Sequence, residues 1–153
     1  MKKVIMVCLG NICRSPIAEG ILRQRAKEQG VEVETDSAGT SAYHEGEAPD
    51  ARMIKAAHAN GIDITDLRAR QFLKSDFKKF DLIYAMDKSN YDNILSLTDN
   101  EQDRAKVRMI LNESSPGSNA EVPDPYFGGE DGFQHVINLL DEAMDYVINR
   151  INE

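Results

Sequence analysis

The first sixteen residues most constrain the fold, because they combine a strand, a short loop and the start of a helix. The apolar, β-branched run Lys3–Val7 predicts a buried strand. Gly10 and Asn11 best tolerate a positive φ, so they predict a tight loop directly after it. Ser15 and Pro16 are favoured at the N-cap and the first position of a helix. We therefore expect the strand end and the helix N-terminus to face each other across this loop.

Farther along the chain, short apolar runs alternate with helical periodicities. This alternation indicates an α/β fold in which one four-stranded parallel sheet carries helices on both faces. A length of 153 residues suits one core, so we expect a single domain over residues 1–153. Ligands of such folds bind beyond the carboxyl ends of the strands, where Cys8 lies. The expected elements are strands at 3–7, 31–35, 81–86 and 106–111, helices at 15–29, 50–60, 89–97 and 133–151, and a surface loop at 112–128.

The loop after the first strand has the residue types of an oxyanion-binding site. Its backbone N–H groups can turn inward around one anion, where the positive end of the helix dipole and the Arg14 guanidinium also point. The same field favours the thiolate of Cys8, which is the nucleophilic form. A strand-end cysteine can also be buried and inert, but Gly10, Asn11 and Ser15 fall where an oxyanion site needs them. The pattern therefore indicates cysteine-based hydrolysis of phosphate esters.

Charge and histidine spacing limit the partners. The chain has 26 Asp and Glu against 18 Lys and Arg, a net charge of -8, which argues against nucleic acid as a partner. An anion must then be bound by a local field in a small, preorganised pocket. His44, His58 and His135 are far apart in the sequence, and no pair has the spacing of metal ligands, so we expect no metal.

Cysteine usage and hydropathy indicate the compartment. Cys8 and Cys13 lie in one loop, where a disulfide would do little to stabilise a fold, and they suit a reducing environment. The apolar run at 4–9 is too short for a signal-peptide core, and no later segment is long enough to span a bilayer. We therefore expect a cytoplasmic protein without membrane insertion.

The run from Val7 to Glu19, VCLGNICRSPIAE, resembles the signature of the low-molecular-weight protein tyrosine phosphatases. Three further segments agree in order: 36–40 (DSAGT), 85–87 (AMD) and 122–126 (VPDPY). The resemblance covers essentially the whole chain. It implies an enzyme that hydrolyses phosphotyrosine and small aryl phosphates through a cysteinyl-phosphate intermediate, with no metal or organic cofactor. It also implies a tyrosine-phosphorylated protein as substrate, for which a tyrosine kinase is one candidate, and inhibition by inorganic phosphate or other oxyanions.

The resemblance assigns the catalytic roles. Cys8 is the nucleophile, Arg14 holds the phosphoryl oxygens, and Asp124 protonates the tyrosine oxygen. Asp124 stands between Pro123 and Pro125, which restrict the backbone on both sides. Pro-Asp-Pro could be only a stiff turn, and the resemblance favours the acid. The expected substrate-binding residues are Leu9, Gly10, Asn11, Ile12, Cys13, Ser15, Tyr43, His44 and Tyr126.

Supporting residues follow from the same resemblance. Ser15 is expected to donate a hydrogen bond to the Cys8 thiolate besides capping the helix. Asn11 and Ser37 match a pair that braces the loop, but Leu67 stands where many members of the family add a histidine to that network.

The resemblance also places the walls of the cleft and leaves one carboxylate with two possible roles. Tyr43 and His44 would form one wall, and Tyr126 with Phe127 the other, which favours a flat phenyl phosphate. Asp87 could orient Arg14 or cap the helix at 89–97, and we prefer the cap.

Two other functions remain possible at this point. An arsenate reductase has a similar loop, but its chemistry passes a disulfide to a further cysteine pair, and this chain has only Cys8 and Cys13. A non-catalytic phosphotyrosine-binding module would not need all the catalytic residue types. Cys13 could protect Cys8 by forming a reversible disulfide, or it could be an apolar filler under the loop.

Overall fold

Four parallel strands form one sheet in the order β2-β1-β3-β4. The structure is a computed structural model that describes residues 1–126 and 128–153, so the predicted wall residue Phe127 lies outside the described residues. The α/β fold and the four-stranded parallel sheet are confirmed. The strands are β1 (Lys2–Cys8), β2 (Val33–Gly39), β3 (Leu82–Ala85) and β4 (Val107–Met109).

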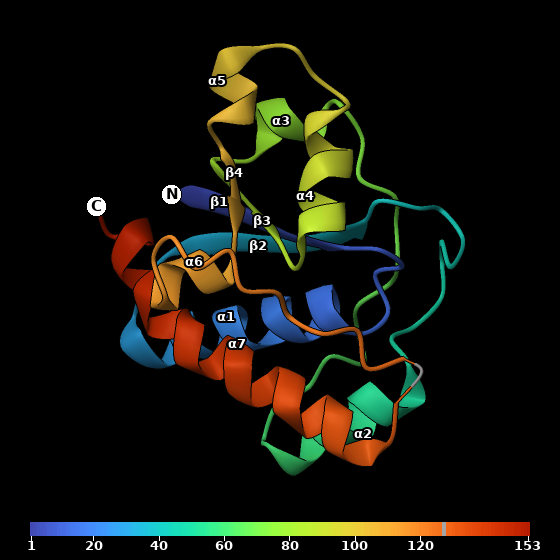
Figure 1. Ribbon diagram of the computed structural model, residues 1–153. Helices are drawn as coiled ribbons and strands as arrows, with labels where there is room; N and C mark the ends of the chain where they lie inside the picture. Colours follow the sequence, from blue (N-terminus) through green and yellow to red (C-terminus); the bar gives the residue numbers. More distant parts are fainter. Residues whose placement is uncertain (127) are drawn as a thin grey trace.

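Helices cover both faces of this sheet (Figure 1). On one face lie α1 (Arg14–Gln29) and α7 (Glu130–Ile151), and α2 (Ala51–Ala59) packs beside α7. On the other face lie α3 (Asp76–Lys79) and α4 (Lys88–Leu95). The short helices α5 (Glu101–Arg104) and α6 (Leu111–Ser114) precede and follow β4.

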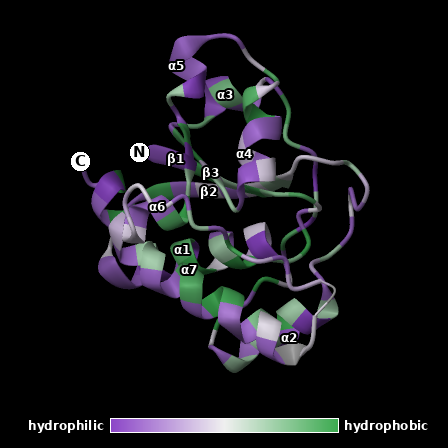
Figure 2. Cartoon of the chain, viewed as in Figure 1, coloured by the Kyte–Doolittle hydropathy of each residue, from purple (hydrophilic) through white to green (hydrophobic). Residues whose placement is uncertain are grey.

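The core has two layers because successive side chains of a strand point to opposite faces. Val4 and Met6 of β1 join the layer formed with α1 and α7, whereas Ile5 and Val7 join the layer under α3 and α4. Figure 2 shows the corresponding stripes of hydrophobic and hydrophilic residues along α7. This arrangement fixes β1 on both sides, so the end of β1 is a rigid support for the loop that follows.

The second strand is longer and later than predicted. It covers 33–39 instead of 31–35, because the Val31 amide caps α1 by donating to the Ala26 carbonyl at 2.8 Å. The strand then continues through polar residues, with Ser37 opposite Met6 and Gly39 opposite Cys8 in the parallel register. Pairing with the buried β1 outweighs the low strand propensity of these polar residues.

The start of α1 also differs from the prediction. Cys13 is the N-cap and Arg14 is the first helical residue, so Ser15 is not the cap. Pro16 fits within the first turn because its missing N–H would have no partner inside the helix. The helix is buried all round from Arg14 to Leu22, and beyond Leu22 only Ala26 is buried. None of the described helices is long and apolar enough to cross a bilayer.

Candidate active site

The Cys8 thiol lies at the carboxyl end of β1, under the loop. Its side chain is only 3% exposed. The Asn11 N–H donates to Sγ at 3.3 Å, and the Ser15 Oγ lies 3.0 Å from Sγ. Asn11 Nδ2 donates to the Ser15 oxygen at 2.8 Å, so the Ser15 hydroxyl proton can point at the sulfur at 3.0 Å or at the Ala38 carbonyl at 3.4 Å, and the sulfur is the nearer acceptor. Two donors therefore converge on a sulfur that accepts best as a thiolate.

Asn11 holds the loop in shape. It adopts φ 58°, a left-handed conformation that Asn tolerates better than most residues. Its Oδ1 accepts the Arg70 N–H at 3.0 Å. Gly10 serves a different purpose from the one predicted, because it does not have a positive φ. A Cβ on Gly10 would lie 3.0 Å from the His44 ring carbon, so glycine lets this ring pack on the loop.

Neighbouring segments hold the backbone of the loop. The Thr40 and Ser41 N–H groups donate to the carbonyls of Cys8 and Leu9 at 2.8 and 3.0 Å, and the Asp50 N–H donates to the Ile12 carbonyl at 2.8 Å. A Cβ on Gly39 would lie 2.7 Å from the Leu9 carbonyl oxygen. Glycine is therefore required where β2 passes under the loop.

Ser37 is a buried residue of β2. Its side chain hydrogen-bonds to Glu19 of α1, and no hydrogen bond joins it to Asn11 in the described part of the chain. Burial raises the pKa of Glu19, and the hydrogen bond from Ser37 partly offsets that effect. The brace on Asn11 is instead the Arg70 backbone.

Arg70 is itself anchored by two carboxylates. Its guanidinium donates to Asp76 at 3.0 Å and to Asp36 at 2.9 Å. Leu67, at the position of the missing histidine, packs against the hydrophobic core. The Arg70 network therefore ties the loop to β2 and α3 without that histidine.

Arg14 is 3% exposed, and its head group reaches the mouth of the loop. Its Nη1 donates to Asp87 Oδ2 at 2.7 Å and to the Val122 carbonyl at 3.0 Å. Burial alone would lower the pKa of Arg14, but the charge of Cys8 and the bond to Asp87 more than compensate and raise it. Arg14 is thus a fixed cation aimed at the pocket.

Asp87 performs both of the roles considered for it. Its Oδ1 accepts the Asn90 N–H at 2.7 Å as the N-cap of α4, while its Oδ2 holds Arg14. The preferred role as a cap is therefore confirmed, and Asp87 also fills the alternative role of orienting Arg14. The sequence signal was present in the Ala-Met-Asp segment, but only the parallel pairing of β3 with β1 brings Asp87 beside Arg14.

Asp124 faces the loop from the segment before α7. Its Oδ2 lies 3.7 Å from Arg14 Nη2, and its Oδ1 accepts the Tyr126 N–H at 3.0 Å. The carboxylate is partly exposed, at 38%, so water and a leaving group can both reach it.

These groups line one cavity of about 340 Å³. The Tyr43 and His44 rings meet edge to face at 4.8 Å, and His44 lies 6.4 Å from the Tyr126 ring. Asn11, Ser15 and Ser37 lie behind this surface. No group of three or more metal-ligating side chains occurs among the described residues. The lining residues are Cys8, Leu9, Gly10, Ile12, Cys13, Arg14, Tyr43, His44, Asp124 and Tyr126.

The model of the low molecular weight phosphotyrosine protein phosphatase family matches residues 3–153. The chain belongs to this family. A protein of Synechocystis sp. is 45% identical over 99% of this chain and 97% of its own length. The low molecular weight phosphotyrosine protein phosphatase of Schizosaccharomyces pombe is 44% identical over 95% of this chain and 94% of its own.

A solved structure agrees with this assignment. The protein tyrosine phosphatase of Entamoeba histolytica, with Hepes in its active site, has a TM-score of 0.93 and 40% identity, and the match covers 99% of this chain and 97% of that one. The predicted family and enzyme class are therefore confirmed: this phosphatase is a cysteine-dependent hydrolase that acts on phosphotyrosine.

Proposed function

We propose that Cys8, Arg14 and Asp124 carry out phosphotyrosine hydrolysis in this phosphatase. In the first step, Cys8 Sγ forms a bond to phosphorus as the bond to the tyrosine oxygen breaks. Arg14 and the loop amides hold the phosphoryl oxygens, and Asp124 gives its proton to the leaving oxygen. The observation that carries the proposal is that all three side chains line one cavity of about 340 Å³.

In the second step, water attacks the phosphorus of the cysteinyl-phosphate and Asp124 accepts a proton from that water. Cys8 leaves as a thiolate, which the Ser15 hydroxyl at 3.0 Å and the Asn11 N–H at 3.3 Å stabilise. The products are inorganic phosphate and the regenerated enzyme. Because phosphate fits the same loop, we expect phosphate and similar oxyanions to inhibit.

The walls of the cavity suit an aryl phosphate. Tyr43, His44 and Tyr126 present aromatic surface at the mouth, and Tyr43 is 85% exposed, so an entering phenyl ring can bury area that is now in water. Because the overall charge of -8 repels anions, the phosphate group of the substrate must be attracted by the local field of Arg14 and the loop. We infer that the substrate is a tyrosine-phosphorylated protein, among which a tyrosine kinase is one candidate.

We also propose a reducing compartment, the cytoplasm, as the place of action. The support is chemical: Cys8 and Cys13 are both free thiols, and Cys8 must stay reduced to attack phosphorus.

The activity can be tested with an aryl phosphate and a phosphotyrosine peptide in the presence of a chelator. We expect release of phosphate from both at rates that the chelator does not change, and competitive inhibition by inorganic phosphate. Reduction of arsenate with a thiol donor, without phosphate release from either ester, would instead indicate the reductase. Tight binding of the peptide without turnover would indicate a binding module.

Asp87→Asn should separate the two roles of Asp87. Asn is as good an N-cap as Asp, so any fall in the melting temperature should come from the lost bond to Arg14 and not from a lost cap. The charge-assisted bond to Arg14 is lost, and bonds of this kind contribute roughly 1.5–3 kcal/mol, so kcat/KM should fall by about tenfold or more. The measurements are steady-state kinetics and thermal unfolding. If kcat/KM were unchanged, Asp87 would be a cap only.

Cys13→Ser should make oxidation harder to reverse. Burial raises the pKa of Cys13, with Asp50 adding to the effect, so peroxide should oxidise Cys8 first. The Cys13 thiol can then displace water from the Cys8 sulfenic acid and form a disulfide. After peroxide and a dithiol reductant, wild type should recover most of its starting activity and Cys13→Ser should recover little. Equal recovery, with no Cys8–Cys13 bridge in mass spectra, would show that Cys13 only packs.

A further inference from the structure

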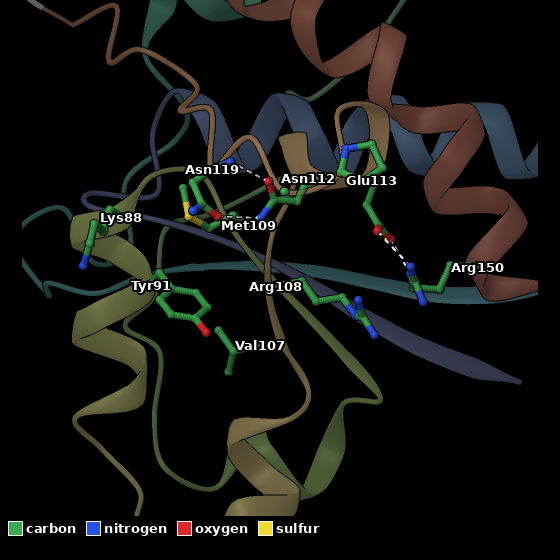
Figure 3. Close-up of a pocket in the computed structure, with 11 residues that line it drawn as sticks. Lys88, Tyr91, Val107, Arg108, Met109, Asn112, Glu113, Asn119 and Arg150 are labelled. Carbon is green, nitrogen blue, oxygen red and sulfur yellow. Dashed lines mark hydrogen bonds and ion pairs between the residues drawn. The ribbon is translucent and has the colours of Figure 1, made fainter.

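A second cavity, of about 620 Å³, lies at the outer edge of the sheet. Its walls come from α4, β4, the segment from α6 to Asn119, and the end of α7 (Figure 3). None of its lining residues lines the cavity around Cys8. It is therefore a separate site, and its size is in the range of roughly 300–1,000 Å³ found for small-molecule pockets.

Arg108, in the middle of β4, is the unusual residue of this cavity. Its Nε is buried and has no hydrogen-bond partner within residues 1–126 and 128–153. Across the same described residues, no carboxylate pairs with its guanidinium either. A buried N–H without an acceptor is costly, and native proteins rarely leave one so. Because Nε itself is not accessible, an acceptor from outside the chain would meet the guanidinium at its Nη groups, which none of the described hydrogen bonds uses.

The carboxylate that lines the same cavity already has partners. Glu113 accepts two bonds from Arg150, at 2.5 and 3.1 Å, and one from the Tyr84 hydroxyl at 2.6 Å. Figure 3 shows the Glu113–Arg150 pair and the Arg108 side chain lining the same cavity. At the α4 side, Lys88 pairs with Asp92. Arg108 is thus a cation whose charge no described neighbour balances.

Apolar groups complete the lining. Val107 and Met109 flank Arg108 along β4, and the Tyr91 ring faces the cavity from α4. The rim is held in shape by Asn112 and Asn119: Asn112 Nδ2 donates to Asn119 Oδ1 at 3.0 Å, and the Asn119 N–H donates to Asn112 Oδ1 at 2.7 Å. The cavity therefore combines one unpaired guanidinium with apolar walls on a fixed frame.

We propose that this cavity binds a small organic anion, whose carboxylate or phosphate group accepts hydrogen bonds from Arg108 and whose apolar body extends across the edge strand β4 toward Tyr91. A planar oxyanion suits the fork of N–H donors on a guanidinium. The protein carries a charge of -8, so the anion is selected by this local cation and by burial of its apolar part.

The test is a titration followed by amide NMR, with 4-phenylbutanoate and benzylphosphonate as probes for the two kinds of head group. Binding should shift the amides of Tyr91, Arg108 and Asn119 saturably. Binding in the active site would shift the amides of Gly10 and Asn11 instead. The two sites are therefore read out separately, and a lack of binding at one does not obscure binding at the other. The uncharged 4-phenylbutanamide should bind at least roughly tenfold more weakly than 4-phenylbutanoate, because it lacks the charge that Arg108 attracts.

Variants decide whether Arg108 is responsible. Arg108→Gln should weaken both probes by roughly tenfold or more at this cavity, and Arg108→Lys, which keeps the charge without the planar fork, should weaken them less. Arg23→Gln makes the same charge change on α1 and should bind as wild type does. The amide spectrum itself shows that each variant is folded. Shifts confined to Gly10 and Asn11, or equal binding by Arg108→Gln and wild type, would overturn the proposal.

Discussion

Cys8→Ser should abolish turnover of aryl phosphates and phosphotyrosine peptides, while the variant should still bind inorganic phosphate. A serine hydroxyl is a far weaker nucleophile than a thiolate at neutral pH, whereas the Arg14 guanidinium and the loop amides remain in place. Steady-state kinetics measure the first effect, and a phosphate titration followed by amide NMR measures the second.

The binding measurement is the control for folding in this experiment. A variant that neither turns over nor binds phosphate has lost the loop, so the loss of turnover would say nothing of the nucleophile. A variant that binds phosphate and keeps a tenth of wild-type activity would show that another residue attacks phosphorus.

Asp124→Asn should slow turnover by a factor that depends on the leaving group. General acid catalysis contributes about 10² to 10⁴ in rate, so kcat/KM for phosphotyrosine should fall by about that factor, with little change in the binding of inorganic phosphate. The loss should shrink for aryl phosphates of acidic phenols, because these phenolates leave with less protonation. The measurement is kcat/KM across a series of phenols of different pKa, because kcat/KM reports the first step, whereas kcat also contains the second step, in which Asp124 is the base.

A matched variant isolates the role of position. Asp131→Asn makes the same charge change in α7, away from the cavity around Cys8, and should leave the dependence on the phenol as in wild type. If Asp124→Asn lost the same factor with every phenol, Asp124 would not be the proton donor.

The catalytic loop could be predicted from the sequence because its parts are adjacent in the chain. Cys8, the loop and Arg14 lie within seven consecutive residues, and the flanking strand and helix have strong local patterns. Asp124 was reached through the resemblance, since Pro-Asp-Pro alone is equally a turn. The local sequence pattern was therefore sufficient to predict functional residues that lie close together in the chain.

The groups that hold the loop from outside could not be predicted in the same way. The Arg70 N–H on Asn11 joins residues 59 positions apart, and the Val122 carbonyl on Arg14 joins residues 108 apart. Backbone groups have no sequence signature, so only the folded chain reveals them. The hydrogen bond between Ser37 and Glu19 could not be predicted either, because Glu19 becomes adjacent to Ser37 only when α1 packs on β2.

Local signals also failed at short or atypical elements. The helices α3, α5 and α6 have four residues each, too few for a helical period to be recognised. The start of α1 was misplaced because Ser15 is a typical cap, yet its hydroxyl lies 3.0 Å from the Cys8 sulfur. The Ser15 hydroxyl, which could have capped the helix, lies beside the catalytic thiol instead.

The most direct test of the mechanism is to locate the phosphoryl group during turnover. Asp124→Asn is mixed with p-nitrophenyl phosphate, a substrate with an acidic phenol, and the reaction is stopped within milliseconds in denaturant and analysed by mass spectrometry after digestion. The first step needs little protonation for this substrate, and the second step lacks its base, so phosphate should accumulate on the peptide that contains Cys8. Release of inorganic phosphate with no phosphorylated peptide, or a phosphoryl group on any other residue, would contradict the mechanism.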